Sequence, residues 1–219
     1  MNTEEFEKII EKIYTDFSDV ADRLSFKLLN LKKNKWVLSD VPYRQFEDLA
    51  LVPIYVFDDD GGNGNVLIKN NHLRYWDITR KELWENVMEN AVKIAPVKIR
   101  NIIQTLEEIR NIRIIGYENP DRMLVVSNED NFFGAGAIFY PGVLKDLARR
   151  FGTDLYVVPA SVHEVIVVSA KGKENGYDII HEILEDVNAH DIPPMDILSN
   201  NVYLYDRKSD KLSICKGDK

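Results

Sequence analysis

The densest group of side chains with catalytic potential is Ser161, His163 and Glu164. A hydroxyl, an imidazole and a carboxylate are the groups that nucleophilic hydrolases combine, with the base within hydrogen-bond reach of the nucleophile. On a strand, however, Ser161 and His163 would point to one face and Glu164 to the other, so Glu164 could not orient the imidazole. The segment also lacks the G-x-S-x-G turn that presents a hydrolase serine. We therefore expect a turn leading into a core strand, with a catalytic role for these three residues as the alternative.

A second candidate site is the aromatic group formed by Tyr75 and Trp76 beside Arg74, with Trp84 a short distance along the chain. Exposed aromatic residues next to an arginine are typical of a binding surface, whereas the same residues would be core if buried. Trp84 fits the apolar side of a helix, which favours the core. Arg74, Tyr75 and Trp76 are nevertheless the predicted ligand-binding residues.

The spacing of candidate ligands does not favour a metal site. The chain has four histidines, and a zinc site needs three or four ligands at favourable geometry. His181-Glu182 begins like the H-E-x-x-H motif, but the fourth position after His181 is Glu185. The carboxylates of segment 58–63 could hold calcium, but no bidentate glutamate follows at the required position. We predict no metal site.

Two glycine-containing segments invite comparison with phosphate loops. The G-G-N-G of residues 61–64 follows three aspartates, which would repel phosphate, and the G-A-G of residues 134–136 matches only the start of the dinucleotide fingerprint. The G-x-x-x-x-G-K-[ST] motif is absent from the sequence. Both segments are expected to be turns or sites of close backbone packing, and no cofactor is predicted.

The overall charge is acidic, because 28 Lys and Arg residues against 36 Asp and Glu residues give a net charge of -8. Nucleic-acid binding needs clustered cations, and the only dense basic run, at residues 32–35, is short, so we predict no nucleic-acid partner. The acidic balance disfavours contact with anionic membranes, and no apolar run reaches the roughly 20 residues of a spanning helix. With the single cysteine Cys215 and no signal-peptide pattern, the chain is expected to be a soluble cytoplasmic protein.

The elements that position these residues follow from the apolar periodicity. Helical spacing predicts helices over residues 6–17, from Thr79 to just before Pro96, and over 98–110, 141–151 and 177–187. Thr79 and Glu82 form the signature of a capping box. Alternating or continuous apolar runs predict strands over residues 24–28, 49–57, 66–69, 123–126, 132–140, 155–158, 165–168, 202–205 and 212–214. Pro53 lacks a backbone donor, which predicts an edge position or a bulge.

Short strands in pairs with tight connections predict an α+β fold, with a mostly antiparallel or mixed sheet, packed helices and a helical hairpin in the middle of the chain. Hydrophobic residues make up 45% of the sequence, enough to build a core. We expect a single globular domain over residues 1–219. Its sub-units are expected at residues 1–111, with a helix, strands and the helical hairpin, and at residues 112–219, an α/β sandwich-like half.

Several stretches of the chain together resemble a family of domains of unknown function from anaerobic gut bacteria. The resemblance covers residues 17–210 and is carried by DRLSFKLLN at 22–30, DVP at 40–42, DLALV at 48–52, NHLRYW at 71–76, YPGVL at 140–144, PASVHEVI at 159–166 and LSNNVYLYD at 198–206. Because the family has no assigned activity, cofactor or catalytic residue, the resemblance implies an uncharacterised bacterial protein. It also implies that members often carry a further N-terminal segment, so this chain is either a short member or a fragment.

The sequence lacks a recognised nucleophile motif, a complete metal spacing and a phosphate loop, which favours a non-catalytic binding or protein-interaction domain. Its partner would be a protein or a small molecule. The alternative is a hydrolase-like enzyme that uses Ser161 and His163. A third hypothesis, suggested by Pro53, is a module that binds a peptide at an exposed sheet edge.

Overall fold

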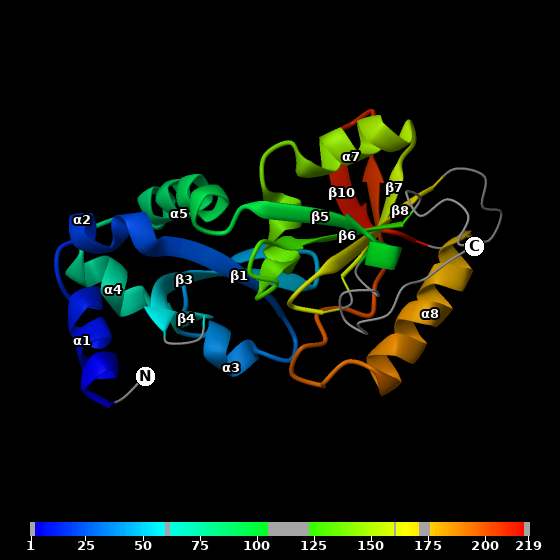
Figure 1. Ribbon diagram of the computed structural model, residues 1–219. Coiled ribbons are helices and arrows are strands. Elements are labelled where there is room, and N and C mark those ends of the chain that lie inside the picture. The colour runs from blue at the N-terminus through cyan, green and yellow to red at the C-terminus, as the bar shows by residue number, and fades with distance from the viewer. Residues whose placement is uncertain (1–2, 60–61, 105–122, 160, 171–175, 217–219) are drawn as a thin grey trace. The chain divides into compact units, whose positions relative to one another are not determined.

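The computed structural model describes residues 3–59, 62–104, 123–159, 161–170 and 176–216 (Figure 1). The chain divides into two compact units, Met1–Pro96 and Val97–Lys219. The sequence analysis places the boundary between sub-units later, after residue 111. The earlier boundary has a simple reason: residues 97–101 form a strand that pairs within the sheet of the second unit.

The first unit is built on an antiparallel sheet with β3 (Leu49–Asp59) at its centre. β1 (Leu24–Asn30) pairs along one side of β3, and β2 (Arg44–Phe46) and β4 (Gly62–Leu67) share the other side. The strands predicted at residues 24–28 and 49–57 are confirmed, as is the hairpin that joins β3 to β4.

Pro53 lies inside this central strand, so the prediction of an edge position is wrong. Its carbonyl accepts a hydrogen bond of 3.0 Å from the N–H of Ile68, which means that its donor-less nitrogen faces the same side of β3. On that side β2 pairs with residues 49–51 and β4 with residues 54–59, so Pro53 falls at the junction between two partners. No ladder bond is lost there. Because both sides of β3 are occupied, the strand does not offer the edge that the peptide-binding hypothesis requires.

One face of this sheet is covered by α5 (Arg80–Ile94), which begins with the predicted capping box. Trp84 of α5 is fully buried and lies against Phe26 of β1, with ring centroids 6.2 Å apart. Its indole N–H donates to the carbonyl of Pro42 at 2.8 Å. The buried ring therefore keeps its one polar atom satisfied.

The other face is covered by α3 (Lys35–Leu38) and the segment that follows it. Leu38 and Val41 pack there against Ala50 and Val52 of β3. These four side chains are buried and form a small apolar cluster of their own. Leu38 at the end of α3 and Val41 in the segment after it therefore hold this part of the chain to the sheet.

The remaining helices of the first unit pack beside the sheet around Trp76. Its indole N–H donates to the carbonyl of Ile13 at 3.0 Å, and its ring lies 5.7 Å from that of Phe17. The first helix is confirmed at the start of the chain. These elements are α1 (Thr3–Ile13), α2 (Phe17–Val20), the 3-10 helix η1 (Ala21–Arg23) and α4 (Asn70–Tyr75).

The second unit contains a sheet in which every described pairing is antiparallel, in the order β10-β9-β7-β8-β6-β5. The predicted strands at 123–126, 155–158 and 165–168 and the closing hairpin are confirmed. The strands are β5 (Val97–Asn101), β6 (Met123–Asn128), β7 (Leu155–Val158), β8 (Val165–Ser169), β9 (Tyr203–Asp206) and β10 (Lys211–Ile214).

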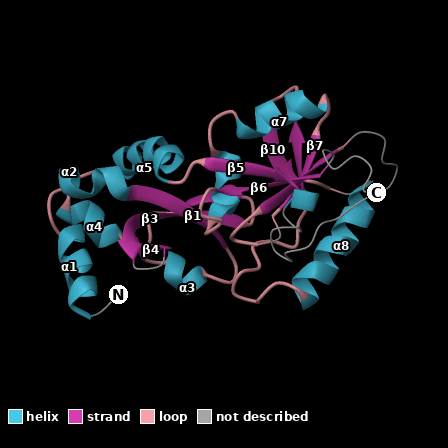
Figure 2. Ribbon diagram, viewed as in Figure 1, coloured by secondary structure: helices cyan, strands magenta, loops and turns pink. Residues whose placement is uncertain are grey.

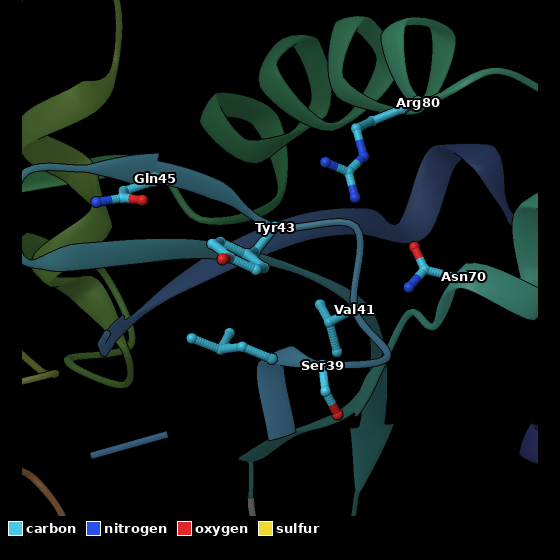
Figure 3. Close-up of a pocket in the computed structure, with 7 residues that line it drawn as sticks. Ser39, Val41, Tyr43, Gln45, Asn70 and Arg80 are labelled. Atoms are coloured by element: carbon cyan, nitrogen blue, oxygen red, sulfur yellow. The ribbon is translucent and has the colours of Figure 1, made fainter. Parts of the chain in front are cut away.

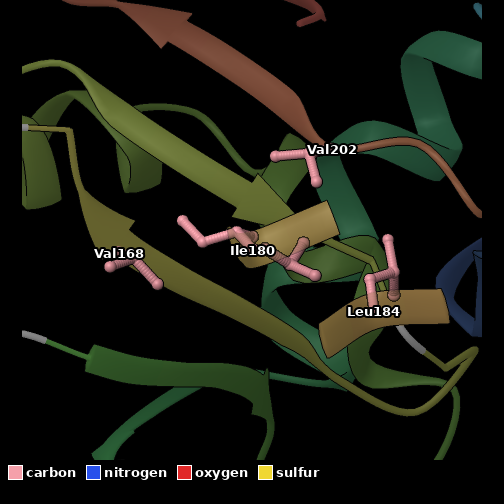
Figure 4. Packing of buried hydrophobic residues seen from close by; sticks show 5 residues of the cluster. Val168, Ile180, Leu184 and Val202 are labelled. Carbon is pink, nitrogen blue, oxygen red and sulfur yellow. The ribbon is translucent and has the colours of Figure 1, made fainter. Parts of the chain in front are cut away.

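Helices lie on both faces of this second sheet (Figure 1). On one face α8 (Gly176–His190) packs Ile180 and Leu184 against Val158, Val168 and Val202 (Figure 4). The side chains that alternate with these along β7 and β8 are also fully buried, because the 3-10 helix η3 (Gly134–Phe139) and α7 (Val143–Phe151) cover the opposite face.

Two predicted elements differ from the structure. The second helix of the expected hairpin, at residues 98–110, begins as strand β5, and residues 102–104 are helical while 105–110 lie outside the described residues. The sequence alternates here, with apolar Val97 and Ile99 on either side of Lys98, which is the period of a strand. The isoleucines that follow have helical spacing, and they led to the prediction of a helix.

The segment at 132–140, predicted as a strand, contains η3. Its small residues Gly134, Ala135 and Gly136 are buried, and they let the backbone approach β6 closely instead of joining the ladder. With helices packed on antiparallel sheets, the predicted α+β class is confirmed (Figure 2). In the described ranges, no helix combines the length and apolar character needed to cross a bilayer.

Candidate functional site

Ser161 is a turn-forming residue in the structure. Its side chain is buried, and its Oγ accepts hydrogen bonds from the backbone N–H groups of His163 at 3.2 Å and Glu164 at 3.3 Å. This is the local hydroxyl-to-backbone pattern that stabilises turns. The hydroxyl therefore holds the entry into β8 in place.

His163 is fixed by its surroundings rather than directed at Ser161. Its ring packs beside the contacting rings of Phe132 and Phe133, with centroid distances of 5.7 Å and 5.5 Å. Nδ1 accepts a hydrogen bond from the backbone N–H of Phe133 at 3.2 Å, so the neutral ring carries its proton on Nε2. In this tautomer neither nitrogen is available as a base for Ser161.

The carboxylate nearest to the imidazole is Asp196, which the sequence analysis does not identify. Its Oδ2 lies 3.9 Å from His163 Nε2. The N–H of Val162 donates to the carbonyl of Asp196 at 2.9 Å, and Ser161 pairs with Ile197 in an isolated bridge. Backbone pairing between distant segments therefore places Asp196, and no local motif could have predicted it.

Close packing in the same region explains why the G-A-G segment has a glycine at position 134. A Cβ on Gly134 would lie 2.2 Å from Ser127 Oγ, 2.5 Å from the nitrogen of Asn128 and 2.8 Å from the carbonyl oxygen of His163. Ser127 Oγ itself donates to that carbonyl at 2.8 Å. The glycine therefore permits close backbone packing around the turn of His163.

The three predicted ligand-binding residues are separated by the structure. Trp76 is core and only 7% exposed. Tyr75 is 59% exposed, and its ring lies edge-on to that of Tyr14 at 5.7 Å. Arg74 is exposed as well. None of the three lines the pocket of the first unit.

The two histidines of α8 each lie near a carboxylate of the same helix. His181 Nδ1 lies 3.9 Å from Glu185 and His190 Nδ1 lies 3.1 Å from Asp186. Asp58, at the start of the segment considered for calcium, forms an ion pair of 3.1 Å with Arg23, and residues 60–61 lie outside the described part of the chain. Across the described residues, no three His, Cys, Asp or Glu side chains are placed to share a metal ion.

His72 is a buried core histidine. Its Nδ1 accepts from the backbone N–H of Lys69 at 3.1 Å, and its ring lies 5.6 Å from Trp76 and 5.0 Å from Tyr14. Burial, with a smaller contribution from the Lys69 charge, lowers its pKa, so the ring is neutral at physiological pH. It caps the start of α4.

An open pocket of about 480 Å³ lies in the first unit. Its polar side chains come from separate segments: Arg80 from the start of α5, Asn70 from the start of α4, and Tyr43 and Gln45 from the segment entering β2. Figure 3 shows Tyr43 between Gln45 on one side and Arg80 and Asn70 on the other. The volume falls within the range of small-molecule sites.

The pocket also has an apolar wall. Leu38 and Val41 line it, and both are almost fully buried because they belong to the cluster on β3. Ser39, between them, donates its hydroxyl to the carbonyl of Trp36 at 2.7 Å. A preformed wall of core residues gives this part of the pocket a fixed shape.

Arg80 is the only charged residue that lines the pocket. No hydrogen bond or ion pair joins the side chains of Arg80 and Asn70 to any residue that the structure describes. The nearest carboxylate in the lining segments, Asp40, is paired with Lys69 at 3.8 Å. The pocket therefore presents one uncompensated cation together with neutral hydrogen-bonding groups.

Lys27 of β1 is a half-buried amine on the face that carries the apolar cluster. Its Nζ donates to Asn65 Oδ1 at 2.7 Å, and it pairs across the sheet with Val52. Burial lowers the pKa of Lys27 to about 8. The charged amine therefore reduces the stability of the first unit at neutral pH.

Comparison with known proteins gives a family but no activity. A family model described as "Family of unknown function (DUF5688)" matches residues 1–207. The searches of curated proteins and of solved structures found no match. The match spans both units and confirms the resemblance to an uncharacterised domain family, while the bacterial source stays a prediction.

Proposed function

Given that the chain belongs to this family of unknown function, we propose that it is a non-catalytic binding domain that takes a small ligand in the pocket of the first unit. The observation that carries this proposal is the set of polar side chains around the open pocket. Arg80 and Asn70 face it without a hydrogen-bonding partner among the described residues. Side chains that converge on a hollow and remain unsatisfied by the protein are the usual means of fixing a ligand.

The lining supports binding rather than catalysis. Its only hydroxyl of serine type, on Ser39, already donates to the backbone of Trp36, and no histidine or carboxylate lines the pocket beside it. Nucleophilic catalysis needs a nucleophile and a base in hydrogen-bond reach. The hydrolase alternative would require Ser161 to leave its turn and His163 to release the N–H of Phe133.

Backbone amide shifts in NMR spectra of the full chain test the proposal. The probes are glutaramate, glutaramide, glucose and inorganic phosphate, each added separately. We expect at least one organic probe to shift the amides of residues 38–45, 70 and 80, and R80Q to reduce those shifts. K81Q is the matched control, because Lys81 is the next residue and its side chain is 80% exposed.

Shifts confined to residues 161–164, or no response of the pocket amides to any organic probe, would overturn the proposal. Turnover of p-nitrophenyl acetate is measured in the same samples. Turnover by the wild type that S161A abolishes would establish the hydrolase alternative instead.

A further inference from the structure

We propose that the ligand of this pocket is a small organic carboxylate whose anionic group binds Arg80 and Asn70 and whose other end carries a hydrogen-bond donor. This inference rests on the proposed function, because it names the chemical class of the ligand for the same pocket.

The charge of the pocket selects an anion. Arg80 is the only charged residue in the lining, and Asp40, which lies in a lining segment, is paired with Lys69 at 3.8 Å. A guanidinium presents parallel N–H groups that match the two oxygens of a carboxylate.

The start of α5 does not supply a competing anion site. The carboxylate of Glu82 accepts hydrogen bonds from the backbone N–H and the hydroxyl of Thr79, and these bonds lower its pKa. The protein's own carboxylate therefore occupies the helix terminus. The side chain of Arg80, and not the backbone of α5, is the group left to bind a ligand.

The neutral groups divide the pocket into two ends. Beside Arg80, the amide of Asn70 can donate to a carboxylate oxygen. At the other end, Gln45 donates one amide N–H to the carbonyl of Glu47 at 3.0 Å, which leaves its oxygen to accept from a ligand donor beside its second N–H. Tyr43 lies between the two ends (Figure 3), and Leu38 and Val41 line the wall.

This arrangement favours a carboxylate over a phosphate. A phosphate group carries a charge of about -1.5 to -2 at pH 7 and is generally bound by several cations or a cluster of backbone N–H groups. The pocket offers one cation, Arg80, and its other polar side chains are neutral. A single negative charge is the better match.

The experiment compares glutaramate, a carboxylate with an amide at its far end, with the neutral diamide glutaramide. Dissociation constants are measured by NMR titration of the full chain. We expect glutaramate to bind about tenfold more tightly, which corresponds to about 1.4 kcal/mol. R80Q should reduce this ratio to about one, because it should weaken the binding of glutaramate far more than that of glutaramide, and K81Q should retain the ratio. Raising the salt concentration should reduce the preference.

The outcomes separate this inference from the function on which it rests. If both probes shift the pocket amides with equal affinity in the wild type, the pocket binds ligands but the carboxylate class is wrong. If inorganic phosphate binds more tightly than glutaramate, the ligand is a phosphorylated compound and the carboxylate class is wrong. If no organic probe shifts the pocket amides, the proposed function itself fails. Circular dichroism of R80Q confirms that the variant is folded.

Discussion

In the second unit, the buried polar side chains of Ser127, Asn128 and Ser161 each hydrogen-bond to backbone groups. In the first unit, Arg80 and Asn70 face an open pocket, and no described residue satisfies their side chains. The cluster with the most catalytic appearance therefore stabilises loops, whereas residues without any recognisable motif line the open pocket. A dense group of reactive side chains in a sequence is not evidence of chemistry until the partners of each group are known.

The two regions differ in how the hydrogen bonds of their backbone groups are satisfied. The turn at 161–164 and the segment after β6 have no strand partners along much of their length, so side chains must satisfy their backbone groups. The first unit instead satisfies its backbone through the β3 ladder and the caps of its helices. Arg80 and Asn70 take no part in these caps, so their side chains have no partner among the described residues.

The largest expected effect comes from G134A, which challenges the close packing in the second unit. The added methyl would collide with backbone atoms of Asn128 and His163, which cannot move independently. We expect a loss of about 3 kcal/mol in the free energy of unfolding. Urea denaturation gives its size, and hydrogen exchange shows whether the amides of the second unit are the ones affected.

G64A in the first unit is the matched control. The three atoms nearest to its new methyl would all belong to the far end of the buried Phe57 ring, and a side chain can shift more readily than backbone atoms. A loss for G64A as large as that for G134A would remove the distinction between the two units.

S161A is expected to have the next largest effect. It leaves the N–H groups of His163 and Glu164 without their acceptor, which should lower the free energy of unfolding by about 1–2 kcal/mol. S213A, at an exposed position in the same unit, should change it by less than about 0.5 kcal/mol. Equal stability of S161A and the wild type would show that the hydroxyl does not hold the turn.

K27M is expected to raise the stability of the first unit, whereas G134A and S161A lower that of the second. Its expected effect is the smallest of the three. The pKa of Lys27 is about 8 in the folded chain against 10.5 as the ordinary value. The folded state therefore binds fewer protons than the unfolded state between these pH values, and wild-type stability rises with pH through that window. Below pH 8 the buried charge is unfavourable, so K27M should be more stable by about 1 kcal/mol at pH 7.

The advantage of K27M should shrink as the pH approaches 10.5. Urea midpoints at pH 7, 8, 9 and 10 measure this trend, and K81M at an exposed position should show none. An advantage that is constant with pH would mean that a better apolar fit, and not the removed charge, stabilises K27M.

Most elements could be predicted because their signals are local. The capping box of Thr79 and Glu82 fixes the start of α5, and the alternation around Phe26 fixes β1. The secondary structure predicted for segments 98–101 and 134–139 is wrong, because the conformation of both segments depends on contacts with β6, which is distant in the sequence. Apolar spacing alone does not distinguish a strand beside β6 from a helix.

The candidate site could not be predicted from the sequence because its members are individually ordinary. Arg80 and Asn70 have no motif, and they come together only because two helices start near the segment that follows α3. Asp196 likewise reaches His163 through backbone pairing at 161–162 with 196–197. The one available signal was the capping box, which places Arg80 at the exposed start of its helix.

The position of Pro53 has a consequence for motion in the first unit. Since β2 and β4 pair with different stretches of β3 on either side of an imide nitrogen, no hydrogen bond of β3 ties their fluctuations together. The three-residue strand β2 can detach while the β3–β4 hairpin stays closed, so its amides should exchange with solvent faster than those of β4. Gln45 belongs to β2, so the Gln45 end of the pocket should move more readily than the wall formed by Leu38 and Val41.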